Sequence, residues 1–156
     1  MIRIKINRTV DILKWAARNG FRKSPFWAFI VATRQCFQFC SHCYEWQNDV
    51  PHMSEETHRG VIDKLCEIGV VFASYYGGEP TLNPQIGSFI RYAKGRGLGV
   101  YINTDLTACP SDERLIEVVE AGVDIISFSL DKVTPAKGNK RAVSSIDPRL
   151  DLLERL

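Results

Sequence analysis

The sequence predicts an α/β protein built on a parallel sheet, and three observations lead to this fold class. Short apolar segments alternate with helical segments four times, at intervals of roughly 25 to 40 residues, which is the pattern of βα units. The apolar segments are continuous runs, as expected for parallel strands that are buried on both faces. Polar or glycine-rich stretches follow each of them, where α/β folds place their ligand sites.

The first two strands are separated by a helix with clear end signals. The first strand is predicted at residues 26–33, FWAFIVAT, and a cysteine-rich loop follows it directly. Ser54 is a typical N-cap for the next helix, and Gly69 is placed to end that helix. The second strand, VVFASYY, spans residues 70–76 and stops at a pair of glycines.

The later elements show the same end signals. Each helix begins at Asn, Ser or Asp, with proline as its first residue in two cases, and glycine follows two of them. The predicted elements are a helix from Asn83-Pro84 to Gly95, a strand at 98–103, a helix from Ser111 to Gly122, a strand at 123–130 and a helix from Asp147-Pro148 to Leu156.

Residues 1–25 are predicted to form a basic flanking helix. Residues 1–23 carry a net charge of +6, whereas the rest of the chain carries −4 of the total +2. One interpretation is a helix packed against the domain; the other is an amphipathic element on a membrane surface or an acidic partner. Nucleic-acid binding is not predicted, because no second basic patch follows.

The composition indicates a soluble protein that we expect in the cytoplasm. The chain has 156 residues, 45% of them hydrophobic, which suffices for a packed core. It shows neither a transmembrane-length apolar run nor the apolar region of a secretory signal. The five cysteines are an odd number and three are clustered, which favours metal or redox chemistry over a disulfide framework.

The four polar stretches are expected to meet at one edge of the sheet. Each of them falls just past the carboxyl end of a predicted strand. They are Cys36 to Cys43, Gly77 to Pro80, Asn103 to Thr107 and Ser129 to Lys132. This edge is therefore the predicted ligand site.

The three clustered cysteines have the spacing Cys36-x3-Cys40-x2-Cys43 within the segment CFQFCSHCYEW. A structural zinc site usually takes four ligands, often from two cysteine pairs, and here only one cluster exists. His52 could supply a fourth zinc ligand, and His42 is a weaker candidate because it adjoins a cysteine. Three thiolates on one loop also suit a four-iron cluster that keeps one iron open for chemistry.

The remaining cysteines are not expected to join this site. Cys66 lies on the buried side of a predicted helix, and Cys109 precedes a proline. Both are interpreted as small core or loop residues.

Together, the cysteine loop and the segment YYGGEP, residues 75–80, resemble the radical S-adenosylmethionine (radical SAM) enzymes. The resemblance implies that Cys36, Cys40 and Cys43 hold a [4Fe–4S] cluster and that S-adenosylmethionine binds the fourth iron. The implied activity is reductive cleavage of this cofactor to a 5′-deoxyadenosyl radical, which abstracts hydrogen from an unknown substrate. An electron donor such as a flavodoxin or ferredoxin is implied as a partner.

The resemblance also assigns further residues to cofactor binding. Gly77 and Gly78 would let the backbone approach the amino group of S-adenosylmethionine, and Glu79 and Pro80 would shape that turn. The other residues implied in cofactor binding are His42 near the adenine and Asn103, Thr104, Ser129 and Asp131 at strand ends.

The core predicted from this resemblance, residues 26–156, is incomplete at its C-terminus. It would form a partial parallel (β/α) barrel with four βα units, whereas the family usually has six. We therefore expect either a portion of a longer enzyme or a chain whose barrel is completed by a second chain. The alternative function is a non-catalytic module that binds zinc or an iron-sulfur cluster.

Overall fold

The computed structural model describes residues 13, 17, 25–40, 42–45, 47, 49–130 and 143–156. Its strands form one sheet in the order β1-β2-β3-β4, and all neighbouring strands are parallel. The strands are β1 (Trp27–Thr33), β2 (Phe72–Gly77), β3 (Gly99–Thr104) and β4 (Ile125–Phe128). This confirms the predicted α/β class. Within the described residues β1 and β4 do not pair, so the sheet is open, as in a partial barrel.

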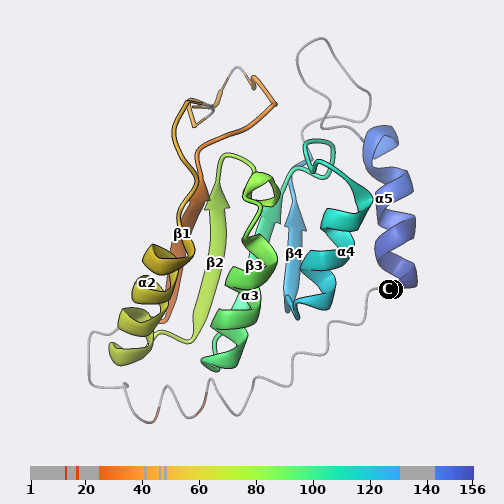
Figure 1. Ribbon diagram of the computed structural model, residues 1–156. Helices are drawn as coiled ribbons and strands as arrows, with labels where there is room; N and C mark the ends of the chain where they lie inside the picture. Colours follow the sequence, from red (N-terminus) through yellow and green to blue (C-terminus); the bar gives the residue numbers. More distant parts are fainter. Residues whose placement is uncertain are drawn as a thin grey trace.

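Helices follow the strands in the predicted alternation, and three of them cover the same face of the sheet (Figure 1). These are α2 (Glu55–Glu67), α3 (Ile86–Gly95) and α4 (Asp112–Glu120), while α5 (Val143–Arg155) lies beside α4. The predicted caps of α2 and α4 are confirmed. The hydroxyl of Ser54 accepts a hydrogen bond from the Thr57 N–H, and that of Ser111 accepts one from the Arg114 N–H.

The predicted start of the helix after β2 is wrong. A short 3₁₀ helix, η1 (Pro80–Leu82), comes first, and α3 begins only at Ile86. The amide nitrogen of Asn83 donates to the Ala32 carbonyl at 2.9 Å and to the Met53 carbonyl at 3.2 Å. Its side-chain oxygen accepts from the Gln85 N–H at 2.9 Å, in the turn before α3. Asn83 therefore joins the end of β1 and the residue before the N-cap of α2 to the turn that precedes α3.

The predicted start of the last helix is also wrong. Helix α5 begins at Val143, and Pro148 lies inside it. A proline removes its own backbone donor, and one missing hydrogen bond near the first turns does not end this helix. Leu150 and Leu153 of α5 pack against a second core cluster that contains Leu106 and Leu115.

The main core lies between the sheet and the three helices. Ile30, Tyr75 and Ile102 point from the strands into this layer and are fully or almost fully buried. The described residues leave the opposite face of β1 open, where Phe29 is 71% exposed and Val31 is 43% exposed. The prediction that the strands are buried on both faces is therefore wrong for β1, because the described helices cover only one face.

The predicted basic helix at residues 1–25 lies almost entirely outside the described residues. Only Leu13 and Ala17, both in helical conformation, are described before residue 25. Within the described part of the chain, no helix is both long and apolar enough to cross a membrane.

Candidate metal and cofactor site

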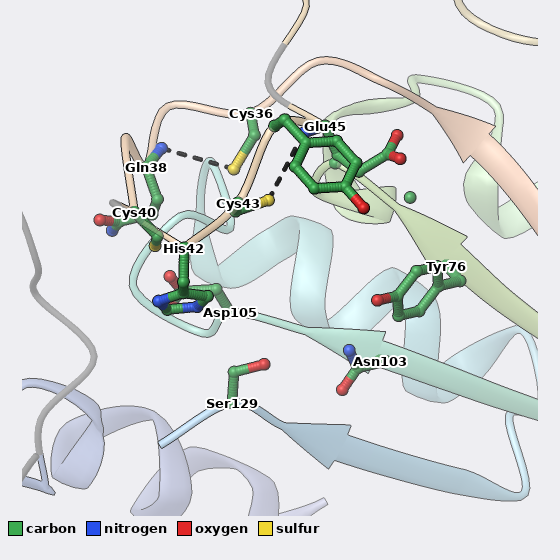
Figure 2. Close-up of a pocket in the computed structure, with 13 residues that line it drawn as sticks. Cys36, Gln38, Cys40, His42, Cys43, Glu45, Tyr76, Asn103, Asp105 and Ser129 are labelled. Carbon is green, nitrogen blue, oxygen red and sulfur yellow. Dashed lines mark hydrogen bonds between the residues drawn. The ribbon is translucent and has the colours of Figure 1, made fainter. Parts of the chain in front are cut away.

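A cavity of about 410 Å³ opens at the carboxyl edge of the sheet, where the sequence predicts the ligand site (Figure 2). The loop after β1 forms one wall, and the ends of the other three strands form the rest. The loop contributes Cys36, Gln38, Cys40, His42, Cys43, Tyr44 and Glu45, and the strand ends contribute Tyr76, Gly77, Gly78, Asn103, Asp105 and Ser129.

The three clustered cysteines all line this cavity. Cys36 and Cys40 are buried and Cys43 is half-buried, and none of them is in a disulfide. Backbone N–H groups donate to two of the sulfurs: Gln38 to Cys36 at 3.4 Å and Glu45 to Cys43 at 3.5 Å (Figure 2). Donors of this kind stabilise thiolates and, in iron-sulfur proteins, help to set the reduction potential.

The sulfurs share a cavity without forming a compact site for one ion. Among the described residues, no group of three or more His, Cys, Asp or Glu side chains is arranged to hold a single metal ion. A zinc ion needs all of its sulfur ligands at about 2.3 Å. In a four-iron cluster each thiolate binds a different iron, and three thiolates on one wall of a cavity are a donor set of the kind that such a cluster takes.

The turn at residues 77–80, at the end of β2 and here called the glycine turn, packs directly against the base of the cysteine loop. The Gly78 N–H donates to the Thr33 carbonyl at 2.9 Å, and the Glu79 N–H donates to the Gln35 carbonyl at 2.8 Å. A β-carbon at Gly78 would come within 2.7 Å of the carbonyl carbons of Arg34 and Gln35. Gly77 has a positive φ of 123°, which disfavours any other residue. The glycines thus permit close approach of β2 to β1.

Glu79 turns away from the cavity and is 1% exposed. One carboxylate oxygen accepts hydrogen bonds from the Thr81 N–H, the Thr81 hydroxyl and the Thr104 hydroxyl, and the other accepts from the Asp105 N–H. Burial raises the pKa of Glu79, and these four hydrogen bonds oppose that rise. Glu79 therefore connects the glycine turn to the end of β3.

The family of the chain follows from its sequence match. The profile of the Radical SAM superfamily matches residues 30–156, a span that contains the cysteine loop, the glycine turn and all of the strand ends around the cavity. The chain belongs to the radical SAM superfamily. This confirms the predicted resemblance.

Curated relatives support the same assignment. A tungsten-containing aldehyde ferredoxin oxidoreductase cofactor-modifying protein from Pyrococcus furiosus is 29% identical over 113 residues, covering 70% of this chain and 32% of the relative. An Fe-coproporphyrin III synthase from Methanosarcina barkeri is 30% identical, covering 65% and 26%. A PqqA peptide cyclase from Streptomyces rochei is 30% identical, covering 74% and 32%. The chain spans about a third or less of the length of these relatives.

Most residues predicted for cofactor binding in this radical SAM chain lie on the cavity wall, but three do not. His42, Gly77, Gly78, Asn103 and Ser129 line the cavity. Glu79, Pro80 and Thr104 are buried behind the wall and support it. Asp131 lies outside the described residues.

His52 and the two remaining cysteines of this radical SAM chain lie outside the cavity wall, whereas His42, the weaker candidate for zinc, lines it. His52 hydrogen-bonds through Nδ1 to the Thr33 hydroxyl at 2.9 Å and is not part of the cavity wall. Cys66 packs against the main core from α2, and Cys109 is buried in the second core cluster. Burial raises the pKa of both of these thiols.

Several residues of the cavity wall were not predicted individually from the sequence, chiefly Gln38, Tyr76 and Asp105. A signal for Asp105 was present in the chain. Side chains two positions apart in an extended segment face the same side, so Asp105 shares a side with Asn103 whereas Thr104 faces the other. No sequence signal distinguished Gln38 from its neighbours in the loop.

Proposed function

We propose that this chain carries the radical-forming site of a radical SAM enzyme, with a [4Fe–4S] cluster and S-adenosylmethionine as its cofactors. One observation carries the proposal: three cysteines and the glycine turn, which are more than 30 positions apart in the sequence, line one cavity. Membership of the superfamily, whose members use these two cofactors, supports it.

The residues of the cavity divide into two groups in this proposal. Cys36, Cys40 and Cys43 would hold three irons of the cluster and leave the fourth iron for the cofactor. The strand ends opposite the loop, which include Gly78 and Asn103, would bind the body of S-adenosylmethionine. When bound, the two groups supply reductive cleavage of the sulfonium to methionine and a 5′-deoxyadenosyl radical.

The charge of the cavity suits a cationic cofactor. Two acidic side chains, Asp105 and Glu45, lie on the wall, and the described wall contains no lysine or arginine. Glu45 is paired with Arg34 at 3.2 Å. Asp105 is 3% exposed, lines the cavity from the end of β3, and accepts hydrogen bonds from Thr107 through Oδ1. A carboxylate in a partly dry site attracts the positive sulfonium and ammonium groups of S-adenosylmethionine.

The proposal concerns the radical-forming step and not one substrate. The three relatives described above are named for different targets, namely the cofactor of a tungsten enzyme, iron coproporphyrin III and the PqqA peptide. We further propose a cytoplasmic location, a reduced flavodoxin or ferredoxin as electron donor, and completion of the barrel by additional strands or a second chain.

Anaerobic reconstitution tests the proposal. We expect about four irons and four sulfides per chain, together with a brown colour and a reduced cluster whose electron paramagnetic resonance (EPR) spectrum changes when S-adenosylmethionine is added. One tightly bound zinc per chain and no change with the cofactor would instead support the non-catalytic metal-binding module. Formation of 5′-deoxyadenosine under dithionite would extend the result from binding to cleavage.

A further inference from the structure

The loop that carries the cysteines places an amide inside and aromatic rings outside. Gln38 is 8% exposed, whereas its neighbours Phe37 and Phe39 are 64% and 58% exposed. Burial of an amide is unfavourable unless its hydrogen bonds are satisfied, and burial of a phenylalanine is favourable. A buried amide between two exposed aromatic residues indicates that hydrogen bonds of Gln38 contribute to the position of the loop.

The amide of Gln38 bonds to the loop after β3. Its Nε2 donates to the Thr107 hydroxyl at 2.8 Å, and this hydroxyl donates in turn to Oδ1 of Asp105 at 2.7 Å. The Thr107 N–H donates to the same oxygen at 3.0 Å. The hydroxyl has a single proton, which it donates to Asp105, so in its bond with Gln38 the hydroxyl is the acceptor and the amide nitrogen is the donor.

This series of hydrogen bonds continues from Asp105 to Glu79, behind the wall of the cavity, and from there back to the cysteine loop. The Asp105 N–H donates to Glu79 at 2.7 Å, and the Glu79 N–H donates to the carbonyl of Gln35 at 2.8 Å. Hydrogen bonds therefore join the cysteine loop to the end of β3, the end of β3 to the glycine turn, and the glycine turn back to the cysteine loop. Within the cysteine loop, the Gln38 N–H donates to the sulfur of Cys36 at 3.4 Å.

We propose that Gln38 is a positioning residue that acts through Thr107 and Asp105. It fixes the cluster-binding loop relative to the strand ends that line the rest of the cavity, here called the cofactor wall (Tyr76, Gly77, Gly78, Asn103, Asp105 and Ser129). This inference rests on the proposed function. With its side chain anchored, the Gln38 backbone N–H stays directed at Cys36, and Asp105 stays directed into the cavity. Loss of the anchor would leave the three thiolates in place but would let the loop move against the cofactor wall.

Gln38→Met tests the anchor, because methionine has a similar length and no amide donor. We expect the iron content to remain at the wild-type value. The dissociation constant for S-adenosylmethionine should rise roughly tenfold, as for the loss of one buried hydrogen bond. The cluster potential should become more negative, since a weaker N–H···S bond stabilises the reduced cluster less.

Two variants at Thr107 and one neighbouring variant make the test specific. Thr107→Val removes the hydroxyl and should reproduce both changes, whereas Thr107→Ser keeps the hydroxyl and should stay near wild type. The double variant Gln38→Met/Thr107→Val should add little to Thr107→Val alone, because Thr107→Val already removes the hydroxyl that accepts from Gln38. Phe37→Ala alters the exposed side chain beside Gln38 and should leave potential and affinity unchanged.

The outcomes separate this inference from the function on which it rests. If the wild-type chain assembles no iron-sulfur cluster, the proposed function fails. If the wild-type cluster forms and binds S-adenosylmethionine, but Thr107→Val leaves potential and affinity at wild-type values, only the anchor is overturned. If Gln38→Met fails to fold, the comparison of Thr107→Val with Thr107→Ser decides, since a difference in affinity supports the anchor and equal values overturn it.

Discussion

The carboxylate of Glu79 accepts a hydrogen bond from the backbone N–H of Asp105 at 2.7 Å and thereby joins the turn after β2 to the end of β3. Its other oxygen accepts from the hydroxyls of Thr81 and Thr104 at 2.6 and 2.7 Å. Every described partner of this buried carboxylate is a donor, so the site requires an acceptor with two oxygens. Glu79 thus supports the cofactor wall from behind.

Glu79→Gln should destabilise the fold by about 1–3 kcal/mol, because the amide nitrogen cannot accept the hydrogen bonds that the carboxylate oxygen accepts. The free energy of unfolding in urea measures this change. Glu120→Gln is the matched control, because Glu120 is exposed at the end of α4 and should change stability by less than about 0.5 kcal/mol. Equal behaviour of the two variants would show that the Glu79 contacts contribute nothing.

A buried histidine on α2 should make stability depend on pH. His58 is fully buried, stacks on Phe89 with ring centres 4.0 Å apart, and hydrogen-bonds through Nε2 to the Tyr75 hydroxyl at 2.7 Å. Burial, assisted by the positive charge of Arg59, lowers the pKa of His58 from 6.5 to about 4. Between these two values the unfolded chain binds a proton that the folded chain does not bind, so stability falls as the pH falls.

We expect the free energy of unfolding to be about 2 kcal/mol lower at pH 5 than at pH 7 because of His58. Urea titrations at several pH values measure the slope. His58→Phe keeps a ring against Phe89 and leaves the Tyr75 hydroxyl bonded to the Phe89 carbonyl at 3.1 Å. In this variant the free energy of unfolding should change much less between pH 4 and 6.5 than in the wild type. An unchanged pH dependence would show that groups other than His58 cause it.

The sequence alone predicted the order of the elements and the edge that carries the site, because both depend on local patterns. Apolar runs, caps and glycine stops specify each βα unit, and the connectivity of parallel strands brings their carboxyl ends together. The side chain of each strand-end residue follows from the alternation of an extended chain. Application of that rule would have selected Asp105 and placed Thr104 behind the wall.

Long-range contacts could not be predicted in the same way. Asn83 looks like an N-cap, but its amide bonds to Ala32, 51 positions away in the chain. Gln38 resembles its loop neighbours in sequence, and its burial depends on a hydroxyl 69 positions away. Such partners are set by tertiary packing, which overrides the local preference of a polar residue.

The three clustered cysteines should be individually necessary for the cluster. Cys36→Ala, Cys40→Ala and Cys43→Ala should each abolish the brown colour of the reconstituted protein, because each removes one of three thiolates on the cavity wall. Iron analysis and the absorption spectrum measure the loss. Cys66→Ala and Cys109→Ala remove thiols that pack in the two core clusters and should retain the full iron content. If Cys109 proves as necessary as Cys40, the ligands are assigned wrongly.

Gly78 should be required for the cluster as well as for the cofactor. If Gly78 served only to let the backbone approach S-adenosylmethionine, as predicted from the sequence, a larger residue here would block the cofactor and spare the iron. In the structure, a β-carbon would instead collide with the backbone of Arg34 and Gln35, at the base of the cysteine loop. Gly78→Ala should therefore displace this loop and lower both iron content and cofactor affinity, measured by iron analysis and by titration with S-adenosylmethionine.

Gly60→Ala is the matched control for Gly78→Ala, because a β-carbon at Gly60 on α2 would meet no atom within 4 Å. Alanine is also favoured over glycine inside a helix, so this variant should keep its iron and gain up to about 1 kcal/mol in stability. If Gly78→Ala keeps a normal iron content and binds S-adenosylmethionine weakly, Gly78 is needed only for close approach of the cofactor. A joint loss, with Gly60→Ala unaffected, would show that the turn after β2 holds the cluster loop in place.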